Sequence, residues 1–231
     1  MVHVCTVAVV DGSQPQQAWI FEGRVDETAG HRDRLLAAMA QSIREQGFRN
    51  TTVADVVRLA RTSRRSFYAN FEDREACFLE LFDVMSEGLL AQIAAAADPE
   101  LGWEEQVERA LGAYLEAMGS EPALMRSYVR EVAGLGERGY EKMRAIAERG
   151  ARQLVELVER AREREPELEP LSFETATIVA GGFRELIMFG IDEGGDLSQL
   201  HRPAADLIKA VLAPRGSQPR RTSDSSRSIT S

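Results

Sequence analysis

The chain has 231 residues, of which 44% are hydrophobic and 28% are charged, and its formal net charge at pH 7 is −9. This composition is typical of a soluble globular protein with a packed core, and the length allows one large domain or two modest ones. The two cysteines, Cys5 and Cys77, exclude a disulfide framework and indicate a reducing cytoplasm. The apolar segment 1–10 has no basic flank and is too short to span a membrane, so we expect neither a signal peptide nor a membrane anchor.

The charges are distributed unevenly along the chain. Residues 31–82 carry nine arginines against seven acids, whereas residues 83–213 carry fourteen lysines and arginines against twenty-five acids. The sequence therefore predicts a basic head and an acidic body. For residues 1–29 we predict a flexible N-terminal arm, and the sequence leaves open a short strand or an upstream extension that the cell does not use.

The head begins with two helical patterns. The first runs from about Gly30 to Gly47, with apolar side chains every three or four residues and a glycine where a C-cap is common. The second begins at Thr52, a good N-cap residue, and lasts about two turns. Arg61 and Thr62 then interrupt the apolar spacing, and Arg61 must either adopt a positive φ or distort the turn.

A third pattern follows this break at once. Ser63 can cap it, and Phe67 and Phe71, four residues apart, point inward on one face. Two short helices joined by a tight break predict a helix-turn-helix.

The outward face of the third helix suits the major groove of DNA. Arginine can pair with two acceptors of guanine, asparagine can match adenine, and hydroxyls and further arginines can hold phosphates. Between Arg49 and Phe71 there are five arginines against one acid, a local charge of +4. The predicted DNA-binding residues are Thr52, Ser63, Arg64, Arg65, Ser66, Tyr68, Asn70 and, beside the N-terminus of the next helix, Arg74.

These residues resemble the DNA-binding head of the tetracycline-repressor (TetR) family. The order and spacing of Phe67, Tyr68 and Phe71 form the most specific part of the resemblance, which runs from Gly47 to Glu75. The sequence departs from the usual pattern at four positions: Arg61 replaces a glycine, Arg65 a small residue, Asn70 a histidine and Arg74 a lysine.

The resemblance implies an all-α fold and a ligand-responsive, sequence-specific transcriptional regulator. A three-helix DNA-binding domain over 30–76 is joined by a long helix to an effector-binding and dimerisation domain over 77–213. The implied protein is a repressor that binds a palindromic operator as a homodimer and is released by a small, largely apolar effector, with the helix over 73–97 transmitting the change. The tail 214–231, rich in Ser, Arg and Pro, is predicted to be disordered.

The body contains further helical patterns separated by short turns, as in helical bundles. We expect helices at about 103–118, 121–134, 137–164, 172–192 and 203–213. The segment 172–192 is apolar on nearly all sides, which predicts burial on two faces, and the last helix is expected to bury Leu207, Ile208, Val211 and Leu212.

The last two helices, 172–192 and 203–213, are the predicted dimer interface. Gly181 and Gly182 remove side chains in mid-helix, which is explained if another backbone or a ligand approaches closely there. Close packing within the chain is the alternative.

Large or adaptable side chains from five helices predict an apolar effector pocket. Ordinary core packing is the alternative for any one of them. Arg126, Arg130, Arg144 and Arg184 can offer a cation to an acidic ligand, although a surface pair with a glutamate is the better interpretation of each. The predicted pocket residues are Trp103, Tyr114, Met118, Met125, Tyr128, Val132, Met143, Phe183 and Met188.

We predict no enzymatic activity, cofactor or metal. The three histidines have no glutamate three residues before them, as a di-iron bundle needs, and there is no glycine-rich phosphate loop or nucleophile elbow. The rival hypothesis is a helical ligand-binding or interaction module whose basic face contacts an acidic protein instead of DNA.

Overall fold

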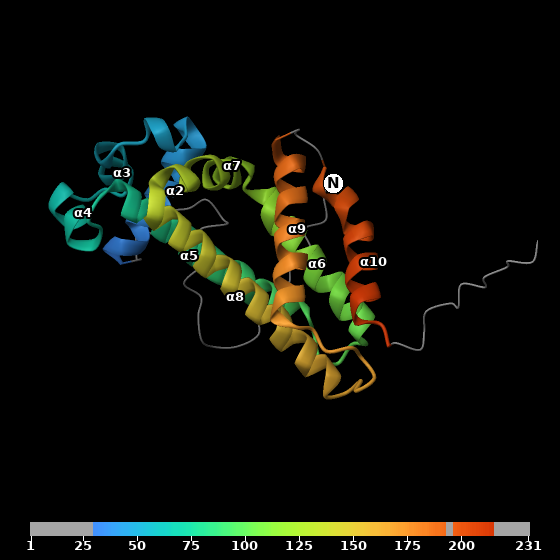
Figure 1. Cartoon of the computed structure of the whole chain (residues 1–231). Coiled ribbons are helices and arrows are strands. Elements are labelled where there is room, and N and C mark those ends of the chain that lie inside the picture. The colour runs from blue at the N-terminus through green and yellow to red at the C-terminus, as the bar shows by residue number, and fades with distance from the viewer. Residues whose placement is uncertain (1–29, 193–195, 215–231) are drawn as a thin grey trace, which may run out of the picture.

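The computed structural model describes residues 30–192 and 196–214, and every regular element in these two ranges is helical, as predicted. Figure 1 shows a small head at one end of a longer helical body. The predicted flexible arm and nearly all of the predicted disordered tail lie outside the described residues. The head comprises α2 (His31–Gln46), the 3₁₀ helix η1 (Phe48–Asn50), α3 (Val53–Leu59) and α4 (Arg64–Asn70).

Local sequence signals determine where the head helices begin and end. The helix α2 ends at Gly47, whose φ of 78° is accessible to glycine without strain. A capping box starts α3: the Oγ1 of Thr52 accepts the backbone N–H of Asp55 at 3.2 Å, and the carboxylate of Asp55 accepts the N–H of Thr52 at 3.0 Å. In the turn before α4, Arg61 has a φ of 49° and is the one non-glycine residue in the described chain with a positive φ.

The long helix α5 (Arg74–Ala96) joins the head to the body, as expected. Asp73 caps it by accepting the N–H of Ala76 at 2.6 Å and also accepts a hydrogen bond from Arg138 at 2.8 Å. Hydrogen bonding to Arg138 lowers the pKa of the Asp73 carboxyl below its usual range. The same carboxylate therefore stabilises the start of α5 and attaches it to the body.

The body helices pack around α5 and α6. The predicted helix 121–134 is two elements, because Val132–Leu135 forms a 3₁₀ turn before Gly136, whose φ is 64°. The last helix starts two residues earlier than predicted. The observed elements are α6 (Trp103–Ser120), α7 (Pro122–Glu131), η2 (Val132–Leu135), α8 (Gly136–Arg162), α9 (Phe173–Asp192), η3 (Leu197–Leu200) and α10 (His201–Leu212).

Two ion pairs between arginines of the head and glutamates at the ends of α7 attach the head to the body. Arg44 of α2 donates to both carboxylate oxygens of Glu121, at 2.9 and 2.7 Å, and Glu121 is buried. Arg49 of η1 pairs with Glu131 at 3.0 Å. A bidentate pair of low exposure restricts geometry more than a single exposed one. The helix α7 is therefore tied to the head at both of its ends.

One face of α9 is more exposed than the sequence predicts. Ile178 and Phe189 are 74% and 58% exposed, so burial of α9 on two faces is wrong for a single chain. Leu207 of α10 is half exposed too, contrary to its predicted burial. A Cβ added to Gly181 or Gly182 would meet no described atom within 4 Å, which excludes close intrachain packing as the reason for these glycines.

Candidate DNA-contacting face and ligand cavity

The exposed face of α4 carries most of the predicted DNA-binding side chains. Ser63, Arg64, Arg65 and Asn70 are exposed, Ser66 is half-buried, and Tyr68 is 58% exposed. Arg64 and Arg65 form no ion pair with any described residue, so both guanidinium groups are available to an external anion.

The opposite face of α4 holds the helix in the head. Phe67 is fully buried, and its ring lies 5.7 Å from that of Phe71 and 5.4 Å from that of Tyr68, centroid to centroid. The Oγ of Ser63 accepts the N–H of Ser66 at 3.1 Å, which caps the helix as predicted. The polar face is thus presented on a helix whose buried side is packed.

Two other arginines near this face are already paired. Arg49 is bound to Glu131, and Arg58 lies 3.6 Å from Asp55. Hydrogen bonds from Thr52 lower the pKa of Asp55, so this carboxylate is ionised at neutral pH. Thr52 is exposed, but its hydroxyl already takes part in the capping box. The unpaired positive charge is therefore concentrated at the start of α4.

Arg74 does not extend toward solvent as predicted. Its Nη1 donates to the carbonyl of Thr51 at 2.9 Å, its Nη2 pairs with Glu75 at 3.1 Å, and its guanidinium carbon lies 4.3 Å from the centre of the Phe48 ring. These contacts hold the side chain half-buried between η1 and α5. The structure therefore corrects the prediction of a phosphate-binding side chain and makes Arg74 a brace within the head.

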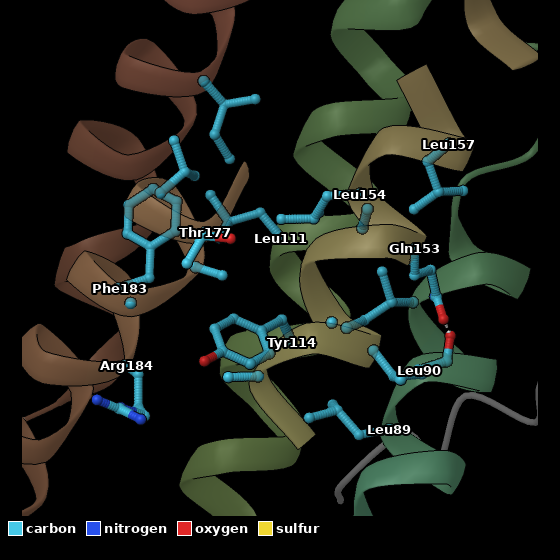
Figure 2. A pocket seen from close by; sticks show the side chains of 18 of the residues that line it. Leu89, Leu90, Leu111, Tyr114, Gln153, Leu154, Leu157, Thr177, Phe183 and Arg184 are labelled. Carbon is cyan, nitrogen blue, oxygen red and sulfur yellow. Dashed lines mark hydrogen bonds between the residues drawn. The ribbon is translucent and has the colours of Figure 1, made fainter. Parts of the chain in front are cut away.

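A cavity of about 410 Å³ lies between the body helices, within the usual size range of ligand pockets. Figure 2 shows side chains from facing helices directed into it, among them Leu111 and Phe183. Eight of the nine predicted pocket residues line this cavity. Val132 does not, because the 3₁₀ turn η2 places it fully buried in the core.

Sequence reasoning missed most of the aliphatic lining. Leucines at helical spacing indicate a buried face but do not distinguish a filled core from a hollow one. Their positions on α5, α6 and α8 relative to the cavity depend on how the helices cross. The missed lining residues labelled in Figure 2 are Leu89, Leu90, Leu111, Gln153, Leu154, Leu157 and Thr177.

A few polar groups lie among this apolar lining. The amide of Gln153 donates to the carbonyl of Leu90 and is thereby satisfied. Arg144, one of the candidate cations, pairs with Glu148 at 2.8 Å on the outer side of α8, as the sequence favoured. Arg184 lines the cavity instead and has no ion pair with a described residue, which corrects the surface-pair interpretation for this arginine.

Aromatic rings connect the head to this cavity. Phe48 of η1 stacks on Phe78 of α5 at 3.7 Å between ring centres. Phe78 meets Phe82 at 4.9 Å, and Phe82 meets Tyr128 at 4.9 Å. Phe82 and Tyr128 both line the cavity. A continuous set of packed rings therefore runs from beneath the head to the cavity wall.

Comparison with known families gives one match within the head. The family described as "Bacterial regulatory proteins, tetR family" matches residues 35–81, which cover α2 to the first part of α5. The uncharacterized HTH-type transcriptional regulator YhgD of Bacillus subtilis (strain 168) is 32% identical over 82 residues, which are 36% of this chain and 43% of that protein. The chain thus matches less than half the length of this curated relative.

Solved structures resemble the chain over most of its length. The fatty acid degradation regulator FadR from Bacillus halodurans has a TM-score of 0.68 at 17% identity, covering 82% of this chain and 100% of the other. The transcriptional regulator FadR from Bacillus subtilis, solved in complex with stearoyl-CoA, has a TM-score of 0.64 at 15% identity, covering 78% and 98%. At identities this low, the two matches establish a shared fold and nothing about function. In the described parts of the chain, no helix has both the length and the hydrophobicity to cross a membrane.

Proposed function

We propose that the chain is a member of the tetR family of bacterial regulatory proteins and acts as a dimeric, ligand-responsive repressor of transcription in the cytoplasm. In this proposal residues 30–76 bind a palindromic operator, and residues 77–213 bind a small, largely apolar effector and form the dimer. The family consists of regulators, which agrees with the expectation that the chain is not an enzyme.

The polar face of α4 is the observation that carries the proposal. Arg64 and Arg65 are unpaired within the described residues, Tyr68 is exposed beside them, and the opposite side of the helix is packed on Phe67. Arginine pairs of this kind read guanine edges or hold phosphates, and the packed side keeps the helix at a defined angle.

The exposed apolar face of α9 supports the homodimer. Ile178 and Phe189 are separated by three helical turns, and Gly182 lies between them on the same exposed face with open space above it. Removing such an apolar face from water is favourable, and a glycine lets a second backbone approach closely. A two-fold pair of heads can then read two half-sites one helical turn, or a multiple of it, apart.

The effector proposal rests on the cavity and on how it connects to the head. An apolar lining of leucines, methionines and aromatic rings suits a ligand with an aliphatic chain. One fold neighbour is a FadR solved with stearoyl-CoA, which is a ligand of this chemical kind. If effector binding shifts Tyr128 and Phe82, the shift reaches Phe78 and Phe48 beneath the head. Linkage requires that operator and effector weaken each other's binding by the same factor.

Selection of bound fragments from random DNA tests this function. The expected result is a palindromic site whose affinity falls steeply and log-linearly with salt concentration, because several phosphates are neutralised. Arg64→Ala and Tyr68→Ala should each weaken binding to the selected site and leave the dimer intact. Failure to enrich any duplex, or undiminished binding by both variants, would contradict the assignment of α4 and favour an acidic protein partner instead.

A further inference from the structure

One corner of the cavity is polar. It is formed by Arg184 of α9, Tyr114 of α6 and Tyr128 of α7, and the guanidinium is close enough to both phenols to oppose the effect of burial on their pKa values. Figure 2 shows the hydroxyl of Tyr114 directed toward α9, the helix that carries Arg184. The lining far from this corner includes Leu154 and Leu157 of α8 and is apolar.

The three polar groups of this corner are hydrogen-bond donors without an acceptor. Within residues 30–192 and 196–214, neither tyrosine hydroxyl has a hydrogen-bond partner and Arg184 has no ion pair. Burial raises the pKa of Tyr114 to about 12 and also raises the pKa of Tyr128, so both phenols stay protonated at neutral pH. Both hydroxyls and the guanidinium can therefore donate to an acceptor that enters the cavity.

Two arginines of α8, neither of which lines the cavity, have ion-pair partners. Arg149 pairs with Asp83 of α5, and Arg144 pairs with Glu148. Both charges are therefore balanced by a carboxylate of the chain. Arg184 differs from both, since it lines the cavity and has no ion pair with a described residue.

The backbone beside Arg184 leaves room for a ligand. Thr177, Gly181, Arg184 and Met188 line the cavity at helical spacing, so they lie on one stripe of α9. At Gly181, one turn before Arg184, an added Cβ would meet nothing within 4 Å. The missing side chain therefore widens the cavity beside the guanidinium.

We propose that this corner binds the head group of an amphiphilic carboxylic acid, so that the effector is a fatty-acid-like anion. The carboxylate pairs with Arg184 and accepts hydrogen bonds from the hydroxyls of Tyr114 and Tyr128, while the aliphatic chain lies along the leucines of α5 and α8. A carboxylate has acceptors only, which complements three donors, and its charge compensates a guanidinium that is partly removed from water. The inference rests on the proposed function, in which the cavity is the effector site.

Direct binding to the full chain tests the inference without DNA. Titration calorimetry with laurate, dodecanol and lauroyl-CoA, each below its aggregation concentration, compares three head groups on the same chain length. The parent should bind laurate about 10- to 100-fold more tightly than dodecanol, the range expected for hydrogen bonds to a charged group. Arg184→Gln should lower the affinity for laurate to that for dodecanol and leave the affinity for dodecanol unchanged.

Two further variants support the measurement. Arg144→Gln removes the same charge from the outer side of α8 and should change neither affinity. Tyr114→Phe removes one hydroxyl and should lower the ratio of the affinities for laurate and dodecanol by about 5-fold. If Arg184→Gln does not fold, as judged by its circular dichroism, Tyr114→Phe carries the test.

Three outcomes in which a compound binds would overturn the inference. One is equal binding of laurate and dodecanol by the parent, and another is an unchanged preference for laurate in Arg184→Gln and Tyr114→Phe. The third is tighter binding of lauroyl-CoA than of laurate with no effect of Arg184→Gln, which would show that the coenzyme A portion, and not a free carboxylate at Arg184, is recognised. Failure of all three compounds to bind would overturn the proposed apolar effector as well. The first of these outcomes, in which dodecanol binds as tightly as laurate, would overturn the head-group inference alone.

Discussion

Arg61 holds the turn between α3 and α4 in a conformation that glycine adopts more easily. Its φ of 49° lies in the left-handed region, which costs a non-glycine residue roughly 1–2 kcal/mol. The strain is tolerated because both neighbouring helices are capped and packed. An arginine here adds positive charge beside α4 at the expense of local stability.

Replacing this arginine with glycine should therefore stabilise the head. We expect Arg61→Gly to raise the free energy of unfolding in urea by up to about 1 kcal/mol, because relief of strain exceeds the greater unfolded-state entropy of glycine. Arg58→Gly, in the helical part of α3, should lower the free energy of unfolding by about 1 kcal/mol. If Arg61→Gly lowered the free energy of unfolding as much as Arg58→Gly does, residue 61 would not have the left-handed backbone conformation.

Arg74 provides a second test at this scale. Arg74→Met should lower the free energy of unfolding by about 1–3 kcal/mol, because it removes the hydrogen bond to Thr51 and the contact with Phe48. It should leave the salt dependence of DNA binding unchanged. Arg65→Met should do the reverse and reduce the slope of log affinity against log salt by about 1. A reduced slope of log affinity against log salt in Arg74→Met would instead support the original prediction that Arg74 contacts a phosphate.

At the scale of helices, α5 and α8 are joined by a partly buried ionic group. Asp83 of α5 accepts from Lys142 at 2.7 Å and from Arg149, both on α8. Burial by itself would raise the pKa of Asp83, but hydrogen bonds from Lys142 and Arg149 outweigh it, and the pKa is lowered from its ordinary value of 3.8. The helix that connects to the head is thereby attached to the wall of the cavity.

This attachment should depend on pH. Because the folded pKa of Asp83 is depressed, its contribution to stability is complete above the unfolded value of 3.8 and is lost as the pH falls through the folded value. Asp83→Asn should therefore be less stable than the parent at pH 7, and the difference should shrink below about pH 4. Glu141→Gln, exposed on α8 and without an ion pair in the described chain, is the control. A difference between parent and Asp83→Asn that stays constant down to about pH 2 would contradict this account.

For the whole molecule, the decisive feature is the apolar face of α9. A monomer would leave Ile178 and Phe189 in water, whereas a two-fold pair would bury them and place two heads on one duplex. In the proposed function, affinity for a palindrome depends on the dimer, because a single helix-turn-helix head contacts only a few base pairs.

Charges introduced on this face should separate the subunits. Ile178→Asp should raise the dissociation constant of the dimer by at least about 10-fold in sedimentation experiments, since burial of such a side chain contributes roughly 1.5–3 kcal/mol. Affinity for the operator should fall with it, while helix content stays that of the parent. Tyr140→Asp, at a site on α8 that is 65% exposed, should change neither property. An unchanged dimer in Ile178→Asp would place the subunit interface elsewhere.

Local signals determined most of the fold and of the exposed polar face of α4. The caps at Thr52, Ser63 and Asp73 and the inward Phe67 act within a few residues, so the sequence alone placed α2 to α5 and the outward side chains of α4. The all-helical body followed from periodicity in the same way. Within the described residues, local patterns missed the three 3₁₀ elements, η1, η2 and η3, and the start of α10.

Partners far apart in the chain were decided only by the tertiary structure. Arg74 is directed inward by its hydrogen bond to Thr51, and this partner lies 23 residues away, beyond the reach of a local pattern. Val132 left the predicted pocket because η2 interrupts its helix, and Arg184 entered the cavity because α9 presents that stripe to α6 and α7. Periodicity shows which face of a helix is apolar. Which charges find a partner, and where the core is hollow, depends on helix crossings that no local pattern contains.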